Sequence, residues 1–371
     1  MPLATRHLAD LGARVIKVER EGSGDFARDY DRTVHGESSY FVWLNRGKES
    51  IELDLEDVAD RELLDRLLGG ADVFVQNLSP GAAERLGLGG EELRAARPEL
   101  IHCSVSGYGS GGPDEKRKAY DLLIQCEAGL VEATGTPESP AKVGISVADI
   151  ATGMYAYSGI LAALYERELT GGGATIETSL IDALAEWMQQ PAYYAAYGER
   201  PTQRSGLRHV SISPYGPYRA GDGEVVYLGV QNDREWAALC REAIDRPELA
   251  ADPRFAHNPE RVEHDADLTE IIEAGFAGLD ADQAIERLTA AGIACARIRT
   301  PAELLDHRQL RARGRWRPVE APGGAIEALA PPVTVAGREP LMRPVPALGE
   351  HNESIRREFA VGKDARPGTS R

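Results

Sequence analysis

The first half of the sequence alternates between strand patterns and helix patterns, and this alternation limits the possible folds more than any other feature. Residues 14–19 alternate apolar and polar side chains and contain β-branched residues, as half-buried strands do. Similar strand patterns follow at 50–55, 71–76 and 100–105. Helical apolar spacing lies before or between them, at 4–11, 60–68 and 91–96. This order predicts an α/β layer built on a mostly parallel sheet.

The middle of the chain changes character. Helical apolar spacing covers 121–133 and 149–167, whereas residues 191–217 are irregular and rich in tyrosine, which is typical of a crossing between domains. A compact region follows, with one strand and three helices predicted near 223–229, 234–245, 265–277 and 282–291. Beyond Gly314 the chain is rich in proline and predicts two short strands at most, and from Lys363 it resembles a frayed tail.

Composition and charge exclude several classes of protein. The chain has 371 residues, with 42 Lys and Arg against 59 Asp and Glu, which gives a formal charge of −17. A surface this acidic repels nucleic acids and anionic membranes unless a local basic patch reverses the field. No apolar run of about 18 residues occurs, and the first residues lack the pattern of a signal peptide, so we expect a cytoplasmic protein without a membrane span.

The four cysteines are scattered, without the short spacing of metal-binding pairs. They are Cys103, Cys126, Cys240 and Cys295. This arrangement predicts buried thiols in a reducing compartment rather than disulfides or zinc ligands.

A glycine-rich segment, Gly107–Gly112, fits the G-x-G-x-x-G pattern directly after a predicted strand. A dinucleotide site needs a helix that opens at once, so that its first amides face the pyrophosphate. Here Pro113 and a charged run intervene, and the match lies in the fourth strand unit. A plain flexible loop is therefore the better interpretation.

Two short basic clusters interrupt the acidic sequence, at Asn45–Lys48 and at Arg117 and Lys118. A solvated surface is the usual explanation of such clusters. Contact with phosphate groups is the functional alternative, since Arg offers paired hydrogen bonds and Lys a point charge. The residues alone do not favour either.

Asp149 stands among apolar neighbours just before a long helical pattern. On its own it is explained as a helix N-cap, and that role is compatible with catalysis because a helix N-terminus keeps a carboxylate ionised. The sequence contains no G-x-S-x-G elbow, no H-E-x-x-H motif and no P-loop. A carboxylate is what remains as a candidate nucleophile.

Short segments with a recognisable order lie along nearly the whole chain. They are Leu8–Arg20, Asn45–Lys48, Leu53–Asp54, Gln76–Asn77, Pro80–Gly81, Arg85–Gly87, Ser106–Gly109, Ala119–Asp121, Val147–Gly153, Gly159–Leu164 and Pro346–His351. In these segments and in their order, the chain resembles the class III CoA-transferases, which include formyl-CoA and carnitine CoA-transferases.

The resemblance implies an α/β fold with a Rossmann-like, doubly wound large domain built from both chain ends and a small inserted α+β domain. It places the large domain at 1–195, a linker at 196–219, the small domain at 220–315 and a return segment at 316–371. It also implies an interlocked homodimer, in which each chain threads the other and active sites lie at the interface.

The family mechanism assigns Asp149 as the nucleophile that attacks an acyl-CoA thioester and later carries CoA as an aspartyl thioester. An aspartate is ionised at neutral pH, and this chemistry requires no metal and no cofactor beyond coenzyme A as substrate. By position, the resemblance assigns CoA contacts to Arg20, Leu53, Asn77, Leu78, Arg85, Lys118 and Tyr120, with Leu53 on the adenine side.

Three departures from the family pattern stand out. Met1 and Pro2 align with the middle of the opening motif, so we expect a start placed too late or a truncated chain that lacks the first strand and a loop touching CoA. Glu56 occupies the position of a CoA-contacting lysine. The glycine-rich flap of formyl-CoA transferase is replaced by Ser205–Gly216, which suggests a different acyl group from formate or oxalate.

Within the family, the racemases of 2-methylacyl-CoA place a histidine at the position of Tyr120. Tyrosine, with a pKa of about 10, would be a poor base there, so transfer is favoured over racemisation. Gly24–Asp31, Ser38–Trp43 and Glu186–Trp187 resemble the subgroup that handles dicarboxylates such as succinate, mesaconate and itaconate.

Arg208 and His209 are candidates for binding a second substrate carboxylate, although ordinary linker residues explain them equally well. A racemase-like enzyme, or a shortened chain that only binds CoA esters, stays as an alternative.

Overall fold

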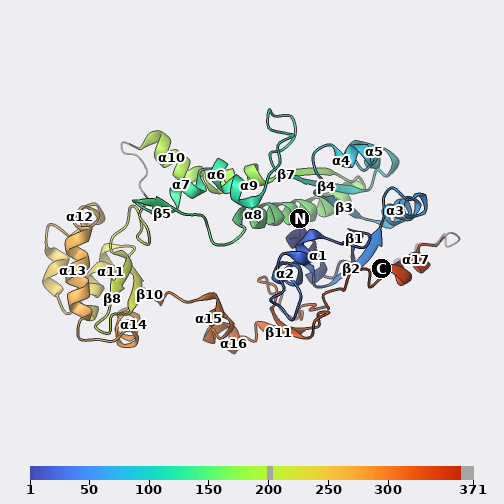
Figure 1. Cartoon of the computed structure of the whole chain (residues 1–371). Coiled ribbons are helices and arrows are strands. Elements are labelled where there is room, and N and C mark those ends of the chain that lie inside the picture. The colour runs from blue at the N-terminus through green and yellow to red at the C-terminus, as the bar shows by residue number, and fades with distance from the viewer. Residues whose placement is uncertain (199–203, 361–371) are drawn as a thin grey trace. The chain divides into compact units, whose positions relative to one another are not determined.

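The computed structural model describes residues 1–198 and 204–360, and the chain divides into two compact units (Figure 1). The first unit comprises Met1–Ala128, Gly144–Gln189 and the described chain from Arg308. The second comprises Gly129–Val143 and the described part of Gln190–His307. The tail expected from Lys363 lies outside the described residues.

Two parallel sheets form the centre of the first unit. In one, β1 (Val15–Arg20) pairs with β2 (Lys48–Leu53). In the other, β4 (Ile101–Ser106) lies between β3 (Val73–Gln76) and β7 (Thr175–Ser179). The four strands predicted in the first half are confirmed to within two residues at each end, and their parallel pairing is the one expected from the alternation with helices.

Helices surround these sheets in the first unit. They are α1 (Pro2–Asp10), the 3-10 helix η1 (Phe26–Asp29), α2 (Ser39–Asn45), α3 (Val58–Gly70), α4 (Ala82–Arg85), α5 (Gly90–Ala96), α6 (Asp121–Glu127), α8 (Val147–Thr170), α9 (Leu180–Trp187), α16 (Arg308–Ala312) and α17 (Asn352–Glu358). The antiparallel pair β11 (Trp316–Val319) and β12 (Ile326–Leu329) supplies the short strands predicted beyond Gly314. Helix α17 was not predicted.

Regularly spaced leucines pack α3 against the core of the first unit. Its four buried leucines, Leu63, Leu64, Leu67 and Leu68, form one apolar face, as the sequence predicted. That face packs in a common core with Ile51 of β2 and Ile355 of α17. Asp57 caps the helix, because its carboxylate accepts the amides of Ala59 and Asp60.

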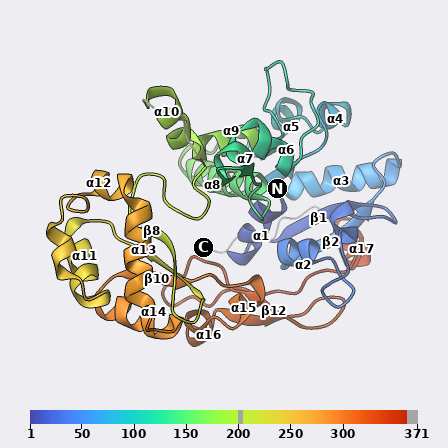
Figure 2. The same ribbon diagram turned by 60° about the vertical axis from the view of Figure 1, so that its left-hand side comes forward.

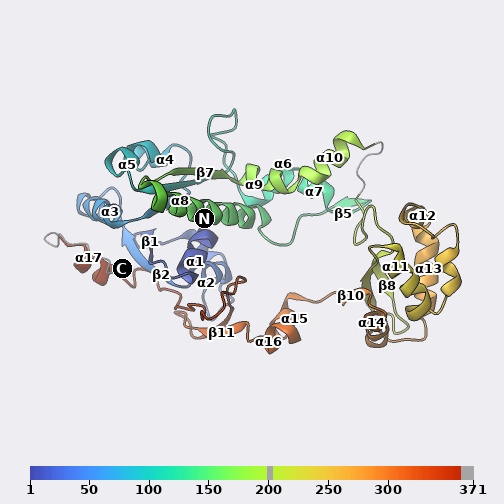
Figure 3. The same cartoon turned by 180° about the vertical axis from the view of Figure 1, so that it is seen from behind.

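Helix α8 is the longest of the first unit and packs against both α1 and β7 (Figures 1 and 3). A Cβ added to Gly153 would lie 3.2 Å from the Cβ of Leu3 in α1, and one added to Gly159 would lie 3.3 Å from Ile176 in β7. These glycines therefore let the helix approach its neighbours closely. Gly171 ends the helix in the left-handed conformation, with a φ of 76°.

Among the described residues, α8 is also the one helix with the length and apolar composition that a membrane span would need. This is weak evidence, because the core helix of a soluble protein has the same properties. Three of its buried residues, Ala156, Ile160 and Ala163, face the protein interior, and two of them share a core cluster with Cys103 and Val105 of β4.

The second unit is an α+β body around one antiparallel sheet (Figure 2). The sheet has the order β10 (Ala294–Arg297), β9 (Val225–Gly229) and β8 (Tyr215–Arg219). Its helices are α7 (Leu130–Ala133), α11 (Asp233–Ala238), the π-helix η2 (Leu239–Ala243), the 3-10 helix η3 (Pro247–Ala251), α12 (Asn258–Glu263), α13 (Asp265–Phe276), α14 (Ala281–Ala290) and α15 (Pro301–Leu305). A small hairpin, β5 (Gly135–Thr136) with β6 (Ser139–Pro140), also belongs to it. The core gathers Trp236, Phe255 and Phe276 from three segments.

Three local predictions were wrong. The stretch 191–217 is not irregular throughout, since it contains most of α10 (Gln189–Tyr197) and the start of β8. The single helix expected at 121–133 is broken into α6 and α7, because Gly129 takes a φ of 79° that only glycine adopts easily. Cys126 is exposed and Cys295 is half-buried, whereas buried thiols were expected; all four cysteines are free.

A buried ion pair joins α1 to the end of α2 and generates a stability prediction. Asp10 and Arg46 have side chains only 3% and 4% exposed, and Arg46 donates to both carboxylate oxygens at 2.9 and 2.7 Å. Replacing one partner of a buried pair leaves the other charge uncompensated, so Asp10→Ala should lower the free energy of unfolding by about 3 kcal/mol. Urea denaturation followed by circular dichroism measures this.

The matched control is Arg32→Ala, which removes an exposed pair with Asp29 whose side chains are 66% and 65% exposed. It should change stability by less than about 1 kcal/mol. Equal denaturation midpoints for the two variants would show that the Asp10 pair does not stabilise the first unit.

Candidate active site at the start of helix α8

Asp149 is the third residue of α8, in its first turn. The simple interpretation as an N-cap is wrong, because Ser146 occupies the cap position and makes no side-chain cap bond. The carboxylate of Asp121 replaces it: its Oδ1 accepts the amide of Ala148 at 2.8 Å and that of Asp149 at 3.2 Å. The side chain of Asp149 is thereby left free of the capping role and exposed to solvent.

Asp121 also brings Tyr120 to this site. Asp121 is the first residue of α6, and Gln125 on the same helix donates to its other carboxylate oxygen at 2.7 Å. Tyr120 precedes it directly and is 66% exposed. Tyr120 is therefore the direct neighbour of Asp121, whose carboxylate binds the backbone of Asp149. In the sequence, Tyr120 and Asp149 are 29 positions apart.

The carboxylate of Asp149 has an unusual environment. Burial by the surrounding protein atoms, and after it the negative charge of Asp121, raises the pKa of Asp149 above its ordinary value. The side chain nevertheless remains open to solvent. A raised pKa makes a carboxylate a stronger nucleophile when it is ionised.

Tyr30 and Tyr40 are two exposed aromatic side chains of the first unit. The pKa of Tyr30 is raised by burial first, and then by the charges of Asp25 and Asp149, so its hydroxyl is within electrostatic range of Asp149. The ring of Tyr30 meets the ring of Tyr40 edge to face, with centroids 5.6 Å apart. Tyr30 and Tyr40 are 56% and 40% exposed. They offer an exposed apolar surface with polar hydroxyls.

The residues that the resemblance assigns to CoA all belong to the first unit. Arg20 ends β1 and Leu53 ends β2, and the two are register partners. Asn77 and Leu78 follow the end of β3, where the amide of Leu78 donates to the side chain of Gln76 at 2.8 Å. The carboxyl ends of parallel strands are the usual ligand-binding edge of an α/β sheet.

Three of these residues, Arg20, Arg85 and Lys118, are exposed cations, and no ion pair or hydrogen bond of their side chains is found within residues 1–198 and 204–360. They are free to meet an anion. Leu53 is different, because its side chain is only 2% exposed and leaves almost no surface for a ligand.

The basic cluster at 45–48 is neither a solvated surface nor a phosphate site. Arg46 and Lys48 are 3% and 5% exposed. Arg46 is paired with Asp10, and the ammonium of Lys48 donates to Asn45 at 2.9 Å. In the second basic cluster, Arg117 is exposed but donates to Glu127 at 2.8 Å. Lys118 is therefore the available positive charge of this cluster.

The glycine-rich segment is a loop without a helix directly after it, as predicted. A Cβ added to Gly107 would lie 2.3 Å from the Cβ of Ala119. The loop thus packs directly against the residue between Lys118 and Tyr120. Within the described part of the chain, no cluster of His, Cys, Asp or Glu has an arrangement suited to a metal ion.

Arg208 and His209 belong to the second unit. Arg208 forms an ion pair with Asp265 at 3.3 Å, and its guanidinium lies over the ring of Tyr218 at 5.2 Å. His209 is exposed and stacks on Tyr215 with ring centroids 5.2 Å apart. Part of the charge of Arg208 is therefore already used within its own unit.

Sequence reasoning missed the capping role of Asp121. Ala119–Asp121 was recognised as a motif, but no local pattern indicates that a carboxylate 27 residues upstream accepts the first amides of α8. The sequence contains one indication that the cap comes from elsewhere. Ser146, Val147 and Ala148, at the start of α8, include no acidic side chain that could cap the helix.

Asp121→Asn should lower the pKa of Asp149, because the amide keeps an oxygen for the amides of α8 while removing the neighbouring negative charge. The carboxyl carbon of Asp149, in protein labelled at its aspartate carboxyls and assigned with Asp149→Asn, reports this in an NMR titration. Asp267→Asn, at an exposed aspartate of the second unit, is the control. An unchanged titration midpoint of Asp149 in Asp121→Asn would show that the charge of Asp121 does not raise the pKa of Asp149.

Known proteins match this chain over most of its length. The profile described as CoA-transferase family III matches residues 1–352. Acetyl-CoA:oxalate CoA-transferase of Acetobacter aceti is 37% identical over 97% of this chain and 92% of its own length. Human succinyl-CoA:glutarate CoA-transferase is 33% identical over 96% of this chain and 82% of its own.

A crystal structure of a CaiB/BaiF family protein from Brucella suis has a TM-score of 0.84 and 33% identity, and the match covers 96% of this chain and 95% of that one. The mixed α/β fold is therefore that of the CaiB/BaiF proteins. With a family profile that matches almost from end to end, the chain belongs to CoA-transferase family III.

Proposed function

We propose that this enzyme moves coenzyme A from an acyl-CoA donor, succinyl-CoA or a similar dicarboxylyl-CoA, to a carboxylic acid acceptor, with Asp149 as the nucleophile. One observation carries the proposal: the Asp149 carboxylate stands exposed in the first turn of α8, while Asp121 occupies the helix amides in its place. A carboxylate that is accessible and not engaged as a cap is what covalent transfer requires.

The chemistry follows from that carboxylate. An oxygen of Asp149 attacks the thioester carbonyl of the donor, the C–S bond breaks, and CoA leaves as a thiolate. The acyl group remains joined to Asp149 as a mixed anhydride. The thiolate attacks the aspartyl carbonyl, the anhydride C–O bond breaks, and the donor acid departs as a carboxylate. The acceptor carboxylate then attacks the aspartyl-CoA thioester, and the two steps run in reverse.

The three unpaired cations support the binding of CoA. Coenzyme A is polyanionic, and a chain with a formal charge of −17 repels such a ligand overall. Arg20, Arg85 and Lys118 can reverse the field locally, since no carboxylate within the described residues neutralises them. Asn77, Leu78 and Tyr120, all exposed, complete the proposed CoA surface.

The relatives favour small dicarboxylates as partners in the exchange. Their names include transferases of oxalate, glutarate and mesaconate, with succinyl-CoA as the donor of two of them. Exposed Tyr30 and Tyr40 provide hydroxyls for a polar acyl chain, and the charge of Asp149 contributes to raising the pKa of Tyr30. We place the second carboxylate of the acid near these residues or near Arg208 and His209.

The working unit that we propose is a cytoplasmic, interlocked homodimer. In it the doubly wound domain of 1–195 and 316–371 binds CoA, the segment 196–219 is a linker, and 220–315 forms the inserted domain.

Asp149→Ala should lower kcat by at least about 10⁴-fold, because the variant cannot form the acyl and thioester intermediates. Transfer from succinyl-CoA to glutarate, followed by mass spectrometry of the CoA esters, measures it. Hydroxylamine added during turnover should convert Asp149 of the parent into a hydroxamate. Asp267→Ala is the control and should be as active as the parent. Transfer by Asp149→Ala at the parent's rate would exclude the mechanism.

Gly107→Ala should raise the KM for the acyl-CoA about tenfold or more, since a Cβ there would lie 2.3 Å from Ala119 and must displace Lys118 and Tyr120. Gly112→Ala in the same loop is the control, because no atom lies within 4 Å of its added Cβ. Steady-state kinetics with varied succinyl-CoA distinguishes the two. Identical KM values for both variants would show that Lys118 and Tyr120 do not contribute to CoA binding.

A further inference from the structure

A buried glutamine binds the carboxylate that caps α8. Gln125, in α6, is only 1% exposed. It lies four residues after Asp121, at the spacing that brings two side chains of a helix together. Its amide nitrogen Nε2 donates to Oδ2 of Asp121 at 2.7 Å. A short bond to a charged group is stronger than a bond between two neutral groups, so the contact holds Asp121 firmly.

The two oxygens of Asp121 have separate partners. Oδ2 accepts the bond from Gln125, whereas Oδ1 accepts the amides of Ala148 and Asp149 at 2.8 and 3.2 Å. The same Nε2 of Gln125 also lies 3.5 Å from the carbonyl oxygen of Ile145, in the segment that leads into α8. A carboxylate held at both oxygens cannot rotate without losing a bond. Gln125 therefore fixes the orientation in which Asp121 caps the helix.

The helix that carries both side chains is itself held in place. Helix α6 packs against α8 and α9, and Ile124, the residue before Gln125, is 0% exposed. This packing is apolar and does not depend on the amide of Gln125. An apolar side chain of similar length at position 125 would therefore keep α6 in place and remove only the hydrogen bond to Asp121.

Two carboxylates can serve the first amides of α8. Asp149 is the acidic residue of the first turn, and Ser146 at the cap position makes no side-chain cap bond. Amides at the start of a helix attract a nearby carboxylate through hydrogen bonds and the helix dipole. If Asp121 turned away, these amides would draw the carboxylate of Asp149 toward them. A carboxylate engaged in this way is less available to attack a thioester.

We propose that Gln125 is a positioning residue that holds Asp121 on the amides of α8 and thereby keeps the carboxylate of Asp149 free to react. The inference rests on the proposed function of Asp149. It assigns a task to a buried amide that the transfer chemistry does not use. Since Gln125 is only 1% exposed, it acts through Asp121 and not by contact with a substrate.

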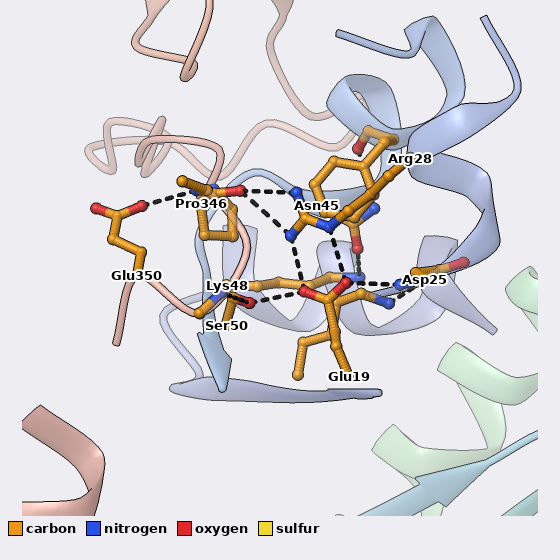
Figure 4. A network of polar contacts seen from close by, with 12 residues as sticks. Glu19, Asp25, Arg28, Asn45, Lys48, Ser50, Pro346 and Glu350 are labelled. Atoms are coloured by element: carbon orange, nitrogen blue, oxygen red, sulfur yellow. Dashed lines mark hydrogen bonds and ion pairs between the residues drawn. The ribbon is translucent and has the colours of Figure 1, made fainter. Parts of the chain in front are cut away.

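A second buried network of the first unit supplies a matched control. Figure 4 shows Glu19 of β1 bound by Arg28 and Ser50. The Ser50 hydroxyl, in a residue that is 0% exposed, donates to Glu19 at 2.7 Å. Ser50→Ala therefore also removes a buried hydrogen bond to a carboxylate, but in a network built on β1 and β2 rather than at the start of α8.

Gln125→Met tests the proposal, because methionine keeps the length of the side chain and loses its amide. With Asp121 released, the amides of α8 should bind Asp149, and such bonds favour the ionised carboxylate. In an NMR titration of the labelled aspartate carboxyls, the midpoint of Asp149 should fall by about half a pH unit or more. With succinyl-CoA and glutarate, kcat should fall about tenfold or more, while the KM for succinyl-CoA stays within about twofold.

Two further variants separate positioning from general destabilisation. Ser50→Ala should unfold at a lower temperature than the parent, but keep the parent's kcat and its titration midpoint for Asp149. Gln125→Met should lower kcat no further in an Asp121→Ala background, because it acts through that carboxylate. Gln125→Leu, a second apolar replacement, takes the place of Gln125→Met if the latter does not fold.

Two results would overturn the role of Gln125. One is an Asp149 midpoint that equals the parent's when Gln125 is replaced by methionine or leucine. The other is a loss of kcat that adds in full to the loss in Asp121→Ala. The titration does not depend on activity. If Asp149→Ala transfers CoA at the parent's rate, the proposed function falls, whereas a lowered Asp149 midpoint in Gln125→Met still shows that Gln125 keeps Asp121 in place.

Discussion

The close packing of α8 is the constraint on which the first unit depends. Gly153 and Gly159 let the helix lie against α1 and β7 at distances that a larger side chain would forbid. A helix held on two sides cannot rotate or slide, so the residue in its first turn has a fixed position. Asp121 then completes the helix end with its own carboxylate, which leaves that of Asp149 pointing outward and free to react.

Charge is distributed unevenly in this acidic protein. Most cations around the first sheet serve the structure: Lys17, Arg28, Arg46 and Lys48 are bound to carboxylates, an amide oxygen or backbone carbonyls. A minority has no such partner within the described residues: Arg20 at the end of β1, Arg85 in α4 and Lys118 in a loop. The difference between paired and unpaired cations separates structural charge from charge that is available to a ligand more clearly than net charge does.

Local features were predictable from the sequence, and distant ones were not. The leucine face of α3 and the four parallel strands follow from periodicity, because each pattern lies within a dozen residues. Asp121 caps α8 through Ala148, 27 positions away, and Arg46 pairs with Asp10, 36 positions away. No local sequence pattern predicts either contact. Asp149 was found as a motif; its surroundings, Tyr30 and Asp121, required the fold. Arg46 and Lys48 were misjudged because basic residues are usually exposed.

The hydrogen bond between Ser50 and Gly349 has a consequence for the order in which the chain folds during its synthesis. The Gly349 amide donates to the Ser50 hydroxyl across 299 residues, and Ser50 in turn holds Glu19. While a ribosome is still synthesising the middle of the protein, this contact does not yet exist. The inserted unit, most of which lies in one continuous stretch, can become compact earlier. The hydrogen bonds that join Glu19, Ser50 and Gly349 are therefore complete only after the final few dozen residues have emerged.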